Sequence, residues 1–163
     1  MSEVNTSRAG GLTDERYERL LRATTTHRQR LVVRFAGEAG LRPAEMCRVR
    51  LGDVTARVEG GQVHYLLDVH DDDGARRRTT YLPAGLKREL ERYANGEGIT
   101  AEAPVFGVTP RRLQMLIGEV AGDDSLGDVS STDLRRYYGR RLLERGVEPS
   151  VVMSVGGWSR LDR

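Results

Sequence analysis

The 163-residue chain has one cysteine, Cys47, and one lysine, Lys87. A lone cysteine excludes a disulfide framework within the chain and points to a reducing compartment. No apolar run approaches the roughly 20 residues that span a bilayer, and the polar beginning of the chain is unlike a secretory signal. We therefore expect a cytoplasmic protein that has no membrane partner.

Histidine is also scarce, with three residues in the chain. A metal site built from His64, His70 and the nearby aspartates would need a convergence that the sequence does not indicate. We therefore expect neither a metal ion nor a small-molecule cofactor. Arginine supplies nearly all the positive charge, but 24 acidic residues against 26 basic ones leave a formal net charge of only +2. Any basic surface must therefore be local.

The length and the hydrophobic content of 38% suit one globular core. Residues 1–12 are polar and glycine-rich without periodicity, so we expect a flexible arm there. Residues 13–163 are expected to form a single domain.

The pattern of this domain predicts an α+β fold that is mainly helical. Apolar residues at helical spacing follow capping positions at Thr13, Pro43 and Thr109. Between them, apolar and polar residues alternate over 54–58 and 63–69, with a third strand over 76–82. Glycine-rich and aspartate-rich turns separate these runs, so we expect a three-stranded antiparallel sheet.

Residues 132–158 are the most informative stretch. Ser131 or Thr132 is expected to cap a helix whose apolar stripe contains Leu134 and Tyr138, and Gly146 ends it. Pro149 then begins a second, short helix, for which the sequence predicts a buried face made by Val151, Val152 and Val155.

This stretch resembles the second conserved block of tyrosine recombinases (phage integrases), where a His-x-x-Arg helix start is followed by Leu-Leu-x-x-Gly and then by Gly-His or Gly-Trp. The matching residues here are Thr132, Arg135, Leu142, Leu143, Gly146, Gly157 and Trp158. About 90 residues earlier, Arg42 and Glu45 fit the family's Gly-Leu-Arg-x-x-Glu turn. The resemblance covers about residues 13–163 and implies the recombinase catalytic-domain fold, without the family's separate N-terminal clamp domain.

The resemblance also implies roles for individual residues. Two arginines, here Arg42 and Arg135, would hold the scissile phosphate with parallel N–H donors, and Glu45 would support them. Trp158 would donate its indole N–H to a phosphate oxygen, or serve only as a packing residue. Arg76, Arg77 and Arg78 would contact backbone phosphates, or form a solvated charged strand.

The sequence departs from the family at the residues that carry out DNA cleavage. Thr132 stands where the family has histidine and cannot act as a general base. Asp73 stands at the position of the family's sheet lysine, which protonates the leaving group. The neighbouring arginines Arg76, Arg77 and Arg78 would be poor proton donors in its place. The family's nucleophilic tyrosine would follow Trp158 by roughly nine residues, beyond Arg163. Tyr137 and Tyr138 lie elsewhere, and Tyr138 is on the apolar stripe.

We therefore expect a DNA-binding pseudoenzyme with a degenerate recombinase fold, one that is not an enzyme by itself and is suited to regulation. Its partners would be double-stranded DNA and either itself or a related recombinase. One alternative is a recombinase or integrase whose tyrosine lies outside this chain or is supplied in trans. Another alternative is a scaffold that binds only protein.

Overall fold

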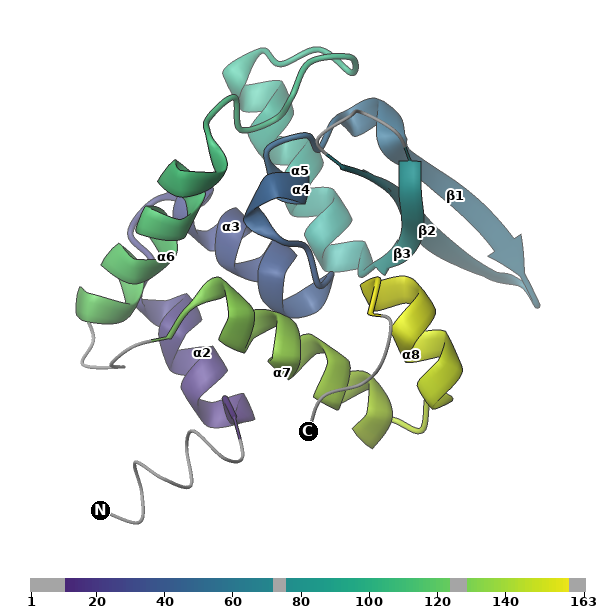
Figure 1. The fold of residues 1–163 in the computed structure, drawn as a ribbon. Coiled ribbons are helices and arrows are strands. Elements are labelled where there is room, and N and C mark those ends of the chain that lie inside the picture. Colours follow the sequence, from purple (N-terminus) through teal and green to yellow (C-terminus); the bar gives the residue numbers. More distant parts are fainter. Residues whose placement is uncertain (1–10, 72–75, 124–128, 159–163) are drawn as a thin grey trace.

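The computed structural model describes residues 11–71, 76–123 and 129–158. Within these residues the chain forms seven α-helices, one short 3-10 helix and three strands (Figure 1). In chain order they are α2 (Asp14–Ala23), α3 (His27–Glu38), α4 (Pro43–Met46), η1 (Leu51–Asp53), β1 (Val54–Glu59), β2 (Gln62–His70), β3 (Arg76–Leu82), α5 (Ala84–Glu97), α6 (Pro110–Asp123), α7 (Ser131–Glu144) and α8 (Pro149–Gly156). The predicted mainly helical α+β fold is confirmed.

Helix α3 is the centre of the helical part. Thr26 caps it by accepting a hydrogen bond from the Gln29 backbone N–H. Its apolar side chains are fully buried, and it packs against α5, α6 and α7 (Figure 1). Phe35 meets Phe106 edge to face, with ring centroids 6.0 Å apart. A hydrophobic core therefore surrounds α3 and joins segments from both ends of the sequence.

The three strands form an antiparallel sheet in the order β1-β2-β3. Gly60 and Gly61 connect β1 to β2, and both have positive φ, 57° and 79°, as a type I′ hairpin turn requires. Glu59 pairs with Gln62 beside this turn, and the register continues to Val54 opposite Leu67.

The outer half of the β1–β2 hairpin is exposed on both faces. Val58 and Val63 belong to the apolar positions of the alternating pattern, yet 70% and 52% of their surfaces are exposed. Leu67, further along β2, is fully buried. The reason is visible in Figure 1, where the hairpin projects beyond the helices, so no part of the described chain covers its tip.

Two smaller expectations at α7 and α8 are wrong. The cap of α7 is Ser130, which forms a reciprocal capping box with Asp133, so Ser131 already lies inside the helix. Val151 is 42% exposed, whereas Val152 and Val155 are buried. A helix that packs against the protein on one side buries only the side chains on that side, and Val151 lies on the other.

The first described residues are tied to α7. The Leu12 side chain is buried, and its carbonyl accepts a hydrogen bond from Arg140. The Tyr137 hydroxyl donates to Asp14 at 2.9 Å, and the Tyr137 ring stacks on Tyr17. The remainder of the predicted arm, residues 1–10, lies outside the described residues. None of the helices described combines the length and apolar character needed to cross a membrane.

Candidate functional site

The turn between α3 and α4 provides a backbone acceptor for two arginines. Gly40 has a φ of +72°, and a Cβ at this position would collide with the ring of Tyr138. Its carbonyl oxygen accepts hydrogen bonds from Nη2 of Arg78 at 3.2 Å and Nη1 of Arg135 at 2.9 Å. Gly40 and Arg135 are 95 residues apart in sequence, so this contact joins the Gly-Leu-Arg turn to the helix that contains Arg135.

Glu45 is the acidic centre of the same region. Its side chain is 5% exposed and accepts hydrogen bonds from the Arg42 backbone N–H at 2.8 Å and from Nη1 of Arg42 at 3.1 Å. It also pairs with both terminal nitrogens of Arg78. Burial by itself would raise the pKa of Glu45, but the hydrogen bonds and charges of Arg78 and then Arg42 lower it below its ordinary value. Glu45 therefore stays ionised and holds both arginines.

Arg135 lies on the buried side of α7, in its second turn. One nitrogen, Nη1, donates to the carbonyl oxygens of Gly40 at 2.9 Å and Gly156 at 2.7 Å. Nε and Nη2 have no hydrogen-bond partner among the described residues. Burial, followed by the charges of Arg42 and Arg78, lowers the pKa of Arg135 to about 10. At neutral pH this guanidinium is still positive.

Trp158 covers Arg135 from the end of α8. Its ring centroid lies 4.5 Å from the central guanidinium carbon, a cation–π contact. A Cβ on Gly139 would approach the ring to 2.8 Å, and a Cβ on Gly156 would come closer still. Two glycines, one on α7 and one at the end of α8, thus make room for the indole.

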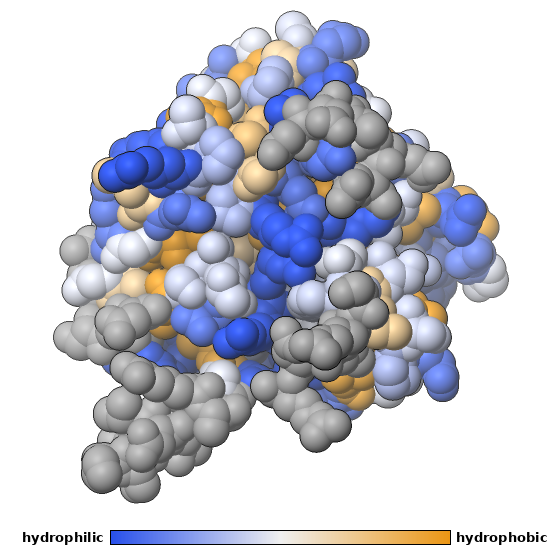
Figure 2. Space-filling view, in the orientation of Figure 1, coloured by the Kyte–Doolittle hydropathy of each residue, from blue (hydrophilic) through white to orange (hydrophobic). Residues whose placement is uncertain are grey.

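We call Arg42, Arg78, Arg135 and Glu45 the arginine cluster. Arg42 is its exposed member, with 47% of its side-chain surface accessible, whereas Arg78 is only 6% exposed. Figure 2 shows strongly hydrophilic side chains gathered near the middle of one face, from α4 to α7. Within the cluster, Arg42 is linked to Arg135 through Glu45, Arg78 and the Gly40 carbonyl, and Trp158 stacks on Arg135.

The remaining candidate residues are placed differently. Thr132 is exposed in the first turn of α7. Arg78 points inward, and besides Gly40 and Glu45 it donates to the Val155 carbonyl at 2.8 Å. The side chains of Arg76 and Arg77 lie outside the described residues, and so does Asp73.

Each of the six tyrosines in the chain lies within the described residues. Tyr138 approaches the arginine cluster but is buried, and its hydroxyl is hydrogen bonded to that of Thr80 at 2.9 Å. Burial raises the pKa of Tyr138, and it raises that of Tyr137 to about 12. Neither phenol has the exposure or the low pKa of an activated nucleophile.

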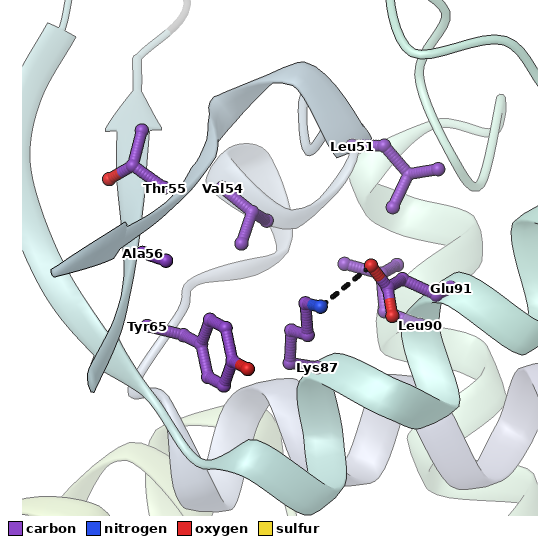
Figure 3. Close-up of a pocket in the computed structure, with 8 residues that line it drawn as sticks. All are labelled: Leu51, Val54, Thr55, Ala56, Tyr65, Lys87, Leu90 and Glu91. Carbon is purple, nitrogen blue, oxygen red and sulfur yellow. Dashed lines mark ion pairs between the residues drawn. The ribbon is translucent and has the colours of Figure 1, made fainter. Parts of the chain in front are cut away.

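The only lysine lies in a separate cavity of about 260 Å³ between the sheet and α5 (Figure 3). Lys87 pairs with Glu91 at 2.8 Å and lies over the Tyr65 ring. The hydrogen bond from Lys87 to Glu91 raises the lysine pKa. Its partners are thus on α5 and β2, and the arginine cluster contains no lysine. The described residues include no group of three or more side chains suited to a metal ion.

Sequence reasoning missed the parts of the site that are not side-chain donors. The Gly40 and Gly156 carbonyls position Arg135, but a backbone acceptor leaves no residue-type signal. The internal role of Arg78 was missed because an arginine in a charged strand is usually solvated. The usable signal was the glycine preceding Arg42 in the Gly-Leu-Arg turn.

No family model matches the chain. It is 29% identical over 163 residues to tyrosine recombinase XerA of Thermococcus kodakarensis, covering 92% of this chain and 54% of the relative. It therefore spans about half the length of that relative. Among solved structures it superposes on the catalytic core of λ integrase with a TM-score of 0.65, 20% identity and 94% of both chains covered. The XerH recombinase in its pre-cleavage complex with difH gives a TM-score of 0.72 at 17% identity, over 91% of this chain and 47% of that one.

Proposed function

We propose that this chain, which has the fold of a tyrosine-recombinase catalytic domain and sequence relatives named tyrosine recombinases, binds duplex DNA by holding a backbone phosphate between Arg42 and Arg135. The observation that carries the proposal is the geometry of the arginine cluster. Two guanidiniums from distant parts of the chain belong to this cluster, Arg42 held by Glu45 and Arg135 held by the Gly40 and Gly156 carbonyls, and each retains N–H groups that no described residue uses.

A phosphodiester is the ligand that these donors suit. Guanidiniums offer parallel N–H groups that match two oxygens of a phosphate, and they keep their charge at neutral pH. Arg42 provides the accessible charge and Arg135 the rigidly oriented one. In the XerH structure a related fold is bound to its difH substrate, which supports DNA as the partner.

We further propose that this polypeptide alone does not cleave DNA and has a regulatory role. The basis is the chemistry around the arginine cluster. By the resemblance, Thr132 replaces a histidine and Asp73 stands at the position of the sheet lysine, and both tyrosines of α7 are buried. A positioned proton donor or acceptor typically contributes about 10² to 10⁴-fold to such a reaction. Bound DNA would therefore be held without being cut.

The first prediction concerns Arg42. Each phosphate neutralised by the protein contributes about −0.9 to the slope of log affinity against log salt. Arg42→Ala should flatten this slope by about one such contribution and weaken binding at low salt about tenfold. Fluorescence anisotropy of a labelled duplex, titrated at several salt concentrations, measures both quantities.

Arg112→Ala is the matched control, since Arg112 is a similarly exposed arginine on α6. It should leave the salt slope close to that of the unmodified chain. If both variants bind equally, the arginine cluster is not the contact. If the unmodified chain does not bind DNA even at low salt, a scaffold that binds only protein becomes the better interpretation.

The second prediction distinguishes binding from recombination. The alternative function, site-specific recombination with a tyrosine from elsewhere, is favoured by the names of the relatives and by the retained arginine pair. A nicked suicide duplex would trap a phosphotyrosyl bond as a protein-linked strand on a denaturing gel. We expect no such band with this chain alone.

A band that disappears in Tyr138→Phe or Tyr137→Phe would contradict the non-cleaving proposal. Adding a related recombinase provides the second arm of the experiment. A covalent strand on that protein, formed only when this chain is present, would establish assembly in trans.

A further inference from the structure

We infer that two copies of this chain associate through the free edge of β1, joining their sheets into one antiparallel sheet of six strands. β2 and β3 lie on one side of β1, and among the described helices and strands Figure 1 shows none along its other side. All of β1 except Val54 is exposed. A strand with an unpaired edge is a template for a second strand.

The type I′ turn determines which backbone groups β1 presents. Glu59 and Gln62 flank this turn, and such a flanking pair is hydrogen bonded. Bonding alternates along an antiparallel ladder, so the N–H and C=O groups of Ala56 and Val58 point away from β2. These two residues therefore supply the donors and acceptors for a partner strand.

Charge selects the partner and its register. A two-fold axis at Val58 places Arg57 opposite the second copy's Glu59, twice in each pair of molecules. Both side chains lie on one face of the strand, with the atoms of their ion pair 4.0 Å apart, and about 60% of each is exposed. An axis at Arg57 would set two arginines against each other, and an axis at Ala56 would set Glu59 against Asp53 of the second copy. An axis at Thr55 would set Arg57 opposite Asp53, but Asp53 is buried and already pairs with Arg50 and His70. The register centred on Val58 is therefore the one that pairs opposite, exposed charges.

The same register gives the exposed valines neighbours. Val58 pairs with Val63 across the hairpin, so the row Val63, Val58 would continue into the second copy's Val58 and Val63. These are the two most exposed large apolar side chains of the described residues. No described part of the same molecule covers these two side chains, because the hairpin projects beyond the helices, and pairing of two β1 strands would cover one side of this valine row. This inference is independent of the phosphate site.

Sedimentation velocity over a range of protein concentrations, without DNA, tests the association. Arg57→Glu and Glu59→Arg should each raise the dimer dissociation constant by about tenfold or more, because each sets like charges opposite each other twice. The double variant, with both changes, should restore association. The matched control is the same exchange at Arg112 and Glu119 on α6, an ion pair of comparable exposure, which should change nothing.

Val58→Pro gives an independent reading. Its N–H points away from β2, so proline should preserve the hairpin but block a partner strand. We expect a folded monomer, with folding checked by circular dichroism. The inference is overturned if the unmodified chain is monomeric throughout, if the dimer is indifferent to either single reversal, or if the double variant remains as weak as the single ones.

Discussion

At the scale of single residues, Glu45 is the side chain on which the candidate site most depends. It satisfies the buried Arg78 and orients the exposed Arg42 through both its backbone and its guanidinium. Removing one partner of a buried ion pair destabilises the fold by more than the intact pair stabilises it, because the other charge is left buried and uncompensated. Glu45 thus links the stability of the fold to the geometry of the phosphate site.

We predict that Glu45→Gln lowers the free energy of unfolding by about 3 kcal/mol at neutral pH. Because the pKa of Glu45 is lowered in the folded protein, its contribution is complete above the ordinary glutamate value of 4.5 and is lost as the pH falls below it. The unmodified chain should therefore lose more stability than the variant between neutral pH and the acid range. Urea unfolding at several pH values measures this difference.

Glu119→Gln is the control for that experiment, since Glu119 forms an exposed pair with Arg112. Its pH dependence should follow that of the unmodified chain. Equal acid sensitivity in the unmodified chain and Glu45→Gln would show that Glu45 does not carry the effect.

At the scale of elements, α8 acts as a cover for α7. The carbonyl of Gly156, its last residue, accepts a hydrogen bond from Arg135, and Trp158, two residues later, stacks on the same guanidinium. Two interpretations of Trp158 follow from the sequence, an indole donor to phosphate or a packing residue. The observed stacking favours the second.

We predict that Trp158→Phe changes stability by less than about 1 kcal/mol and leaves DNA affinity almost unchanged, because a phenyl ring keeps the stacking. Trp158→Ala should cost about 2 kcal/mol and weaken DNA binding, since Arg135 loses its cover. Thermal unfolding and anisotropy titrations measure the two quantities. A large loss of affinity in the phenylalanine variant, with stability retained, would instead identify the indole N–H as a phosphate donor.

At the scale of the whole molecule, the sequence predicts the order of helices and strands well because local chemistry marks their limits. Thr13 accepts the expected capping bond, Pro43 begins α4, and Gly146 has the positive φ expected after α7. Arg42 and Arg135 were identified because their motif spacings match a known fold. Such features depend on residues close to each other in the chain.

What the sequence could not predict depends on contacts between distant segments. Alternation in β1 and β2 indicates that Val58 and Val63 share a face, but not whether anything covers that face. The burial of Arg78 needs Glu45, 33 residues away, and the Val155 carbonyl, 77 residues away. Neither partner leaves a mark near Arg78 in the sequence.

The composition of the arginine cluster has a consequence for the speed of binding. Three guanidiniums and one carboxylate leave two positive charges, so the cluster attracts an anion although Glu45 and the carbonyl groups of Gly40, Val155 and Gly156 already hold it in place. The side chains of the site are therefore already ordered before DNA binds, so little conformational entropy is lost on binding. Association with DNA should then occur in a single phase whose rate falls with ionic strength, as expected for electrostatic steering onto a rigid surface.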